Sequence, residues 1–123
     1  MIKNYEDLDV YKRSYKLSLE INELSDKLPK KEQYNLADQI RRASRSIPSN
    51  IAEGFGRKRH VKEFVNFLHM ALGSNDEMLF NIRLMKDLKY ISLDEYGILS
   101  QEYVIVGKQL TSLIKSWKKF ITD

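Results

Sequence analysis

The sequence predicts an all-α protein, an up-and-down four-helix bundle with long antiparallel helices. Apolar residues recur at every third or fourth position along four long stretches, the spacing of one helix face. Short segments separate these stretches, and none shows the period-two alternation of a β-strand. A chain of 123 residues fits a single domain, residues 1–123, because a core of this size covers well over half of the unfolded surface.

The first predicted helix spans residues 8–28 and carries two apolar faces. One face repeats apolar or small residues with a three–four spacing: Val10, Ser14, Leu17, Ile21, Leu24 and Leu28. The nearly opposite face holds Leu8, Tyr11, Tyr15 and Leu19. Pro29 disfavours helical geometry at the residue before it, so the helix is predicted to end there. A lone bundle would cover only one of the two faces.

The second predicted helix begins near Lys31 and ends around Gly54 to Gly56, where a glycine can take the left-handed conformation that closes a helix. Pro48 lies inside it and removes the donor for the carbonyl of Ser44, so we expect a helix kinked at Pro48. The apolar stripe continues beyond the proline, which favours one kinked helix over two separate ones.

Four residues around the proline form a predicted structural motif: Pro48, Asn50, Glu53 and Gly54. Asn50 lies close to the apolar face and is expected to satisfy the carbonyl that Pro48 frees. Ser44 and Ser49 are expected to bond backbone carbonyls near the bend. Glu53 can pair with Arg57 four residues later or neutralise Arg42 on the same face.

The third predicted helix runs from Val61 to Lys89 and has a broad apolar sector, with Met70 and Phe80 outside it. Gly73 lies mid-helix, which predicts a close approach by a neighbouring backbone. Residues 92–95, SLDE, form a capping box that starts the fourth helix at Leu93. The fourth helix has an unbroken seam: Tyr96, Leu99, Tyr103, Val106, Leu110, Leu113, Trp117 and Phe120.

Positive charge is concentrated in one segment. The chain has a net charge of +4, yet residues 41–62 contain a single acid, Glu53, among their charged residues. The basic residues there are Arg41, Arg42, Arg45, Arg57, Lys58, Arg59 and Lys62. Localised positive charge attracts polyanions, although a solvated basic face is the plainer interpretation.

The sequence argues against an enzyme and against a metal or cofactor. The chain has no cysteine and no Glu-x-x-His pair, and its two histidines, His60 and His69, do not share a helix face at metal-binding spacing. No serine near the proline has a histidine at a spacing that suggests a shared base. The N-terminus lacks a secretory signal, and no window approaches a membrane span, so a soluble cytoplasmic protein is expected.

Three segments carry a resemblance to a known family: IRRASRSIPSNIAEGFGR, DLDVYKRSYKL and FVNFLHMALGSNDE. Together they resemble the four-helix-bundle family encoded in intervening sequences of bacterial 23S ribosomal RNA genes, over residues 7 to about 90. That family is similar to the accessory variability proteins of diversity-generating retroelements, which form homopentameric rings and associate with nucleic acid and a reverse transcriptase. The resemblance implies a pentamer with a basic surface for RNA or DNA.

Two functions are therefore predicted. The first is a non-enzymatic, oligomeric nucleic-acid-binding protein whose phosphate contacts come from Arg41, Arg42, Arg45, Arg57, Lys58 and Arg59. The alternative is a protein-interaction adapter that docks an acidic partner protein such as a reverse transcriptase, through the same basic faces or through Met70 and Phe80.

Overall fold

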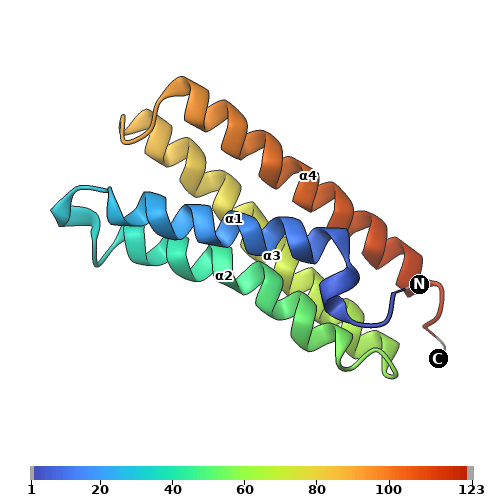
Figure 1. Ribbon diagram of the computed structural model, residues 1–123. Coiled ribbons are helices and arrows are strands. Elements are labelled where there is room, and N and C mark those ends of the chain that lie inside the picture. The colour runs from blue at the N-terminus through green and yellow to red at the C-terminus, as the bar shows by residue number, and fades with distance from the viewer. Residues whose placement is uncertain (1, 122–123) are drawn as a thin grey trace.

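A computed structural model describes residues 2–121 and contains four α-helices in up-and-down order (Figure 1). The helices are α1, Asp9–Asp26; α2, Leu36–Phe55; α3, Val61–Asp87; and α4, Leu93–Lys118. Two short 3-10 turns precede α1 and α2: η1, Tyr5–Asp7, and η2, Lys30–Glu32. No strand occurs in the described part of the chain, so the all-α four-helix prediction is confirmed.

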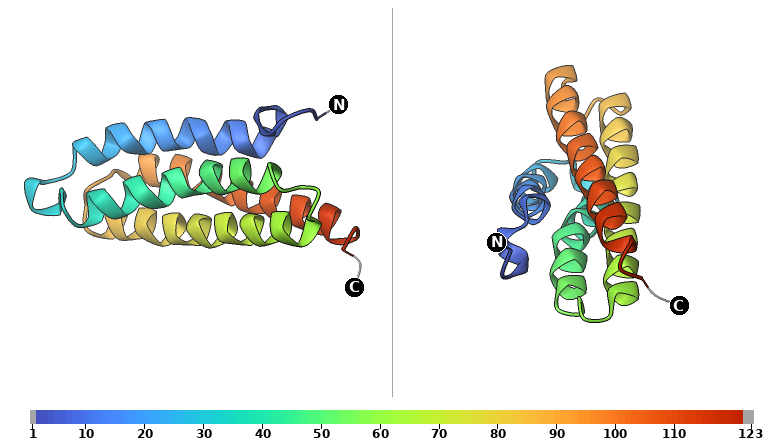
Figure 2. Two further views of the ribbon diagram at one scale, coloured as in Figure 1. Left: turned by 90° about the horizontal axis from the view of Figure 1, so that it is seen from below. Right: turned by 90° about the vertical axis from the view of Figure 1, so that its right-hand side faces the viewer.

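Each helix packs mainly against its neighbours in sequence, and α1 meets α4 only along a thin seam (Figure 2). Arg13 of α1 crosses this seam, with its Nη1 2.8 Å from one carboxylate oxygen of Glu102 and 3.0 Å from the other. The core between the helices is filled by fully buried apolar side chains, among them Ile21, Ile40, Ile47, Ile51, Phe64, Leu68, Met78, Ile82, Tyr103 and Leu110.

The predicted second face of α1 is confirmed only for Tyr15 and Leu19, because Leu8 and Tyr11 are partly buried and pack against the core. Val10, Leu17 and Ile21 of the core side are buried, whereas Tyr15 and Leu19 remain about half exposed. The described residues form a bundle that leaves these two side chains uncovered.

The predicted start of the second helix is wrong, because α2 begins at Leu36 rather than near Lys31. The residues between Pro29 and Leu36 reverse the chain and close the end of α1. The side-chain amide of Gln33 donates to the backbone carbonyls of Ser25 and Leu28, at 2.9 Å each. Carbonyls at a helix C-terminus need such partners, so this segment caps α1 instead of extending α2.

The predicted left-handed glycine at the end of α2 is also wrong. Gly56 has φ −63°, and the helix ends in 3-10-type hydrogen bonds, such as the one from Arg57 N–H to the carbonyl of Gly54.

Gly54 is required by helix packing rather than by helix termination. A Cβ added there would lie 2.6 Å from Cβ of Phe67 and 3.1 Å from Cδ1 of Phe64, so α2 and α3 approach each other closely at this point.

α2 is continuous through Pro48, which is buried within it. Ser44 donates its hydroxyl to the carbonyl of Arg41, as expected for a serine in this helix. The role predicted for Asn50 is wrong: its amide donates to the carbonyl and hydroxyl of Ser46, at 2.8 and 2.9 Å, rather than to the carbonyl of Ser44.

The third helix differs from its prediction at Gly73. A Cβ at Gly73 would meet no atom of the described chain within 4 Å, so no neighbouring backbone of this chain approaches it. The exposed positions predicted for Met70 and Phe80 are confirmed, with 54% and 66% of their surfaces accessible.

The fourth helix begins as predicted and ends earlier. Ser92 Oγ accepts from Glu95 N–H and Glu95 Oε1 accepts from Ser92 N–H, which confirms the capping box. Phe120 does not continue the buried seam, because it lies beyond the last helical residue, Lys118, and is 58% exposed.

Candidate nucleic-acid interface

Arg41, the first predicted phosphate-binding residue, is bound within the fold. Its Nε donates to Ser25 Oγ at 2.8 Å and its Nη2 to Gln33 Oε1 at 2.7 Å, and Asp26 lies 3.5 Å from Nη2. Only 21% of its side chain is accessible. Because these partners come from the end of α1 and from the segment before α2, Arg41 joins the first two helices and is poorly placed to reach a phosphate.

Arg42 and Arg45 lie on the outer side of α2 and are accessible. Arg42 forms a 3.1 Å ion pair with Asp38 one turn earlier, with 73% of the arginine side chain exposed. Arg45 donates to Asn22 Oδ1 of α1 at 2.6 Å. Exposed pairs of this kind contribute little to stability and exchange readily with solvent. Both arginines are therefore open to an anionic ligand.

The remaining predicted residues gather at the end of the bundle, in the loop between α2 and α3. Arg57 lies between two carboxylates, Glu53 at 4.0 Å and Glu63 at 3.6 Å. The predicted pairing of Glu53 with Arg57 is thus confirmed. Lys58 Nζ lies over the ring of Phe55, 4.0 Å from its centroid. Arg59 is exposed and has no side-chain hydrogen bond or ion pair within residues 2–121.

The structure brings the end of α4 to the same place. The end of α4 and the α2–α3 loop lie at the same end of the bundle (Figure 2, left), and the rings of Phe64 and Trp117 are 4.9 Å apart. Three exposed lysines of α4 and its C-cap thereby join the loop residues. We call the combined surface the basic end, and it consists of Arg57, Lys58, Arg59, Lys62, Lys115, Lys118 and Lys119.

The basic end spans two segments that are far apart in the sequence. The α4 lysines were missed because the fourth helix was interpreted only as a core seam. The run KSWKKF, residues 115–120, does carry a signal of nucleic-acid binding, since it interleaves three lysines with two aromatic residues.

Arg42 and Arg45 do not belong to the basic end. They lie more than two helical turns away from the α2–α3 loop, which is about 20 Å along α2 for Arg42.

Acidic groups near the basic end reduce its field only in part. Glu53 and Glu63 are both engaged with Arg57. The N-terminal turn η1, which packs on α2, adds Glu6 and Asp7. The backbone N–H groups of Lys3 and Asn4 bond the carboxylate of Asp7 and hold the pKa of Asp7 below its ordinary value, so this group stays ionised.

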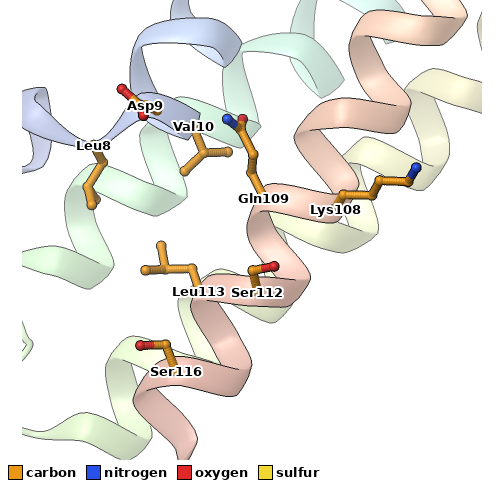
Figure 3. Close-up of a pocket in the computed structure, with 8 residues that line it drawn as sticks. All are labelled: Leu8, Asp9, Val10, Lys108, Gln109, Ser112, Leu113 and Ser116. Atoms are coloured by element: carbon orange, nitrogen blue, oxygen red, sulfur yellow. The ribbon is translucent and has the colours of Figure 1, made fainter.

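A hollow of about 460 Å³ opens between the start of α1 and the second half of α4 (Figure 3). Figure 3 shows Leu8 and Val10 on one wall and Leu113 on the other, with the serines Ser112 and Ser116 along α4. No histidine lines it, so these hydroxyls have no imidazole base beside them. Within residues 2–121, no three His, Asp or Glu side chains gather as metal ligands.

None of the described helices is long and apolar enough to cross a bilayer.

Comparison with a solved structure supports the fold. A crystal structure of a protein of unknown function from Bacteroides thetaiotaomicron, assigned to the S23 ribosomal protein family, superimposes with a TM-score of 0.79. The two are 26% identical, and the match covers 86% of this chain and 98% of the other. No curated protein matches the sequence.

The sequence pattern of one family extends over all four helices. Residues 6–112 match the family described as 23S rRNA-intervening sequence protein, so the match reaches well into α4 and beyond the residues whose resemblance was apparent from motifs. This chain therefore belongs to the 23S rRNA-intervening sequence protein family.

Proposed function

We propose that this protein binds nucleic acid without catalysing a reaction, and that the basic end makes the main phosphate contacts. One observation carries the proposal: two distant segments, the α2–α3 loop with the first turn of α3 and the end of α4, place seven cationic side chains on one end of the bundle. Six of the seven are exposed, and Lys58 is partly buried. The family description refers to 23S rRNA, so RNA is the first ligand to test.

Phosphate contacts of this kind release counterions, so the affinity should fall steeply as salt rises. Binding of a fluorescent single-stranded RNA can be compared between wild type and a variant with Arg57, Arg59, Lys118 and Lys119 changed to glutamine. We expect the variant to lose affinity about tenfold or more at low salt. The slope of log affinity against log salt should become shallower by about 3, since each single-strand phosphate contact contributes about 0.7.

A second variant of equal net charge controls for general electrostatics. It changes four exposed cations elsewhere on the bundle to glutamine: Lys16, Lys27, Lys31 and Arg83. The proposal expects this variant to bind RNA nearly as well as wild type. Equal losses in both variants would show that only total charge matters, and no binding by wild type at low salt would exclude the function.

We also propose that the protein works as a homopentamer, the assembly that the resemblance to the accessory variability proteins implies. Exposed apolar side chains support self-association: Tyr15 and Leu19 on α1, and Met70 and Phe80 on α3. Five basic ends on one particle would bind RNA more tightly than one, because the later contacts become intramolecular. Light scattering should give five times the 14.5 kDa chain mass. A stable monomer would contradict the assembly.

A protein-interaction adapter is the second candidate. The exposed side chains of Met70 and Phe80 favour it, because large apolar groups on a helix surface often mark a contact site. Purification from cells with nuclease treatment separates the two functions. Protein partners that persist after nuclease favour the adapter, and partners that disappear favour nucleic acid.

A further inference from the structure

A chain of aromatic rings leads from the core to the basic end. Phe55 and Phe64 contact each other edge to face with centroids 5.9 Å apart, and Phe64 contacts Trp117 at 4.9 Å. Trp117 in turn contacts Phe120 at 5.9 Å. Phe64 is fully buried, Trp117 is partly buried and Phe120 is 58% exposed, so the chain of rings emerges at the surface.

One cation lies beside the exposed end of this chain of rings, and others lie on the adjacent residue and the neighbouring loop. Lys119 Nζ lies 5.9 Å from the centroid of the Phe120 ring, and Lys118 is exposed at the last residue of α4. On the neighbouring loop, the guanidinium of Arg57 lies 5.2 Å from the ring centroid of Phe67. Aromatic faces beside positive charges match the two parts of a nucleotide, a flat base and a phosphate.

We propose that the basic end binds single-stranded nucleic acid, with an unpaired base stacking on Phe120, beside Trp117, while Lys118 and Lys119 contact the flanking phosphates. This inference rests on the proposed function and names its ligand class. Bases inside a duplex are already stacked and paired, so away from its ends a duplex offers its backbone and groove edges but no free base face to this surface. An unpaired base has a free face that can cover the exposed Phe120 ring.

Electrostatics alone would give the opposite preference. Duplex DNA or RNA carries a higher charge density than a single strand, so a purely basic patch binds the duplex more tightly. A preference for the single strand at equal salt is therefore a signature of stacking rather than of charge.

The intrinsic fluorescence of Trp117 can report binding in the test, because Trp117 is the only tryptophan and lies next to Phe120. Wild type is titrated with a single-stranded RNA of roughly 12 nucleotides and with a duplex of the same length. We expect the single strand to quench the Trp117 fluorescence and to bind severalfold more tightly than the duplex, because one stacked base is worth about tenfold or more and the charge advantage of the duplex offsets only part of it. Equal or tighter duplex binding would overturn the inference.

Variants at one ring separate stacking from charge. Phe120→Ala should weaken single-strand binding about tenfold and leave duplex binding within about twofold, whereas Phe120→Tyr should retain the preference. Tyr34→Ala is the matched control, since Tyr34 is also an exposed aromatic residue but precedes α2, about 30 Å along that helix from the α2–α3 loop. It should leave both affinities unchanged. Unchanged or equally reduced binding in Phe120→Ala would reject stacking.

The test also distinguishes failure of this inference from failure of the proposed function. If RNA binds at the basic end but single and double strands bind alike, the function stands and the ligand class is wrong. If neither form of RNA binds wild type at low salt, the proposed function fails and the inference fails with it.

Discussion

Replacing Gly54 with alanine is expected to lower the free energy of unfolding by about 2 kcal/mol. The added methyl group would lie 2.6 Å from Cβ of Phe67 and 3.1 Å from the ring of Phe64. A Cβ atom cannot swing aside, so α3 must shift, and such overpacking costs about 3 kcal/mol. The better helix propensity of alanine offsets about 1 kcal/mol of this cost.

Gly73→Ala is the matched control for this experiment. It makes the same substitution within a helix, at a position where a Cβ would meet nothing within 4 Å. It should therefore stabilise the protein by about 0.5–1 kcal/mol through helix propensity alone. Urea denaturation of both variants measures the difference. If Gly54→Ala were as stable as wild type, the close packing of α2 on α3 would be refuted.

Removing the side chain of Arg41 is expected to cost about 2–3 kcal/mol of stability, because hydrogen bonds from a charged group contribute more than neutral ones. Arg41→Ala breaks the bonds to Ser25 Oγ and Gln33 Oε1 that tie the end of α1 to α2. Arg41→Lys should rescue little, since a lysine cannot reproduce two divergent guanidinium bonds. Thermal or urea unfolding provides the measurement.

The adjacent arginine provides the control. Arg42 is 73% exposed and within residues 2–121 pairs only with Asp38, so Arg42→Ala should change stability by no more than about 0.5 kcal/mol. Neither substitution should alter RNA affinity as strongly as the changes at the basic end. A large loss of RNA binding in correctly folded Arg41→Ala, without a loss of stability, would instead assign Arg41 to the ligand.

The helices themselves were predictable, and their ends less so. Apolar spacing identifies all four helices, and the capping box of Ser92 and Glu95 predicts where α4 begins, because the two residues act on each other locally. The start of α2 depends on Gln33, whose amide reaches carbonyls five and eight residues earlier in the chain. Such a bond has no periodic signature in the sequence.

The candidate interface was predictable in part for a similar reason. Arg57, Lys58 and Arg59 are consecutive, so their clustering is visible in the sequence. Arg41 belongs to the same basic segment, yet the orientation of its side chain depends on how α1 ends. The residue types in the sequence do not reveal that orientation. The α4 lysines join the loop only because antiparallel packing returns the chain to the same end of the bundle.

The thin seam between α1 and α4 has a consequence for how the chain folds. Extensive packing occurs between consecutive helices, so most native contacts are local and little loop-closure entropy opposes them. We therefore expect rapid folding by successive helical hairpins, with α1, α2 and α3 able to pair while α4 is still being synthesised. The last helix then closes the bundle, and its arrival is also what completes the basic end.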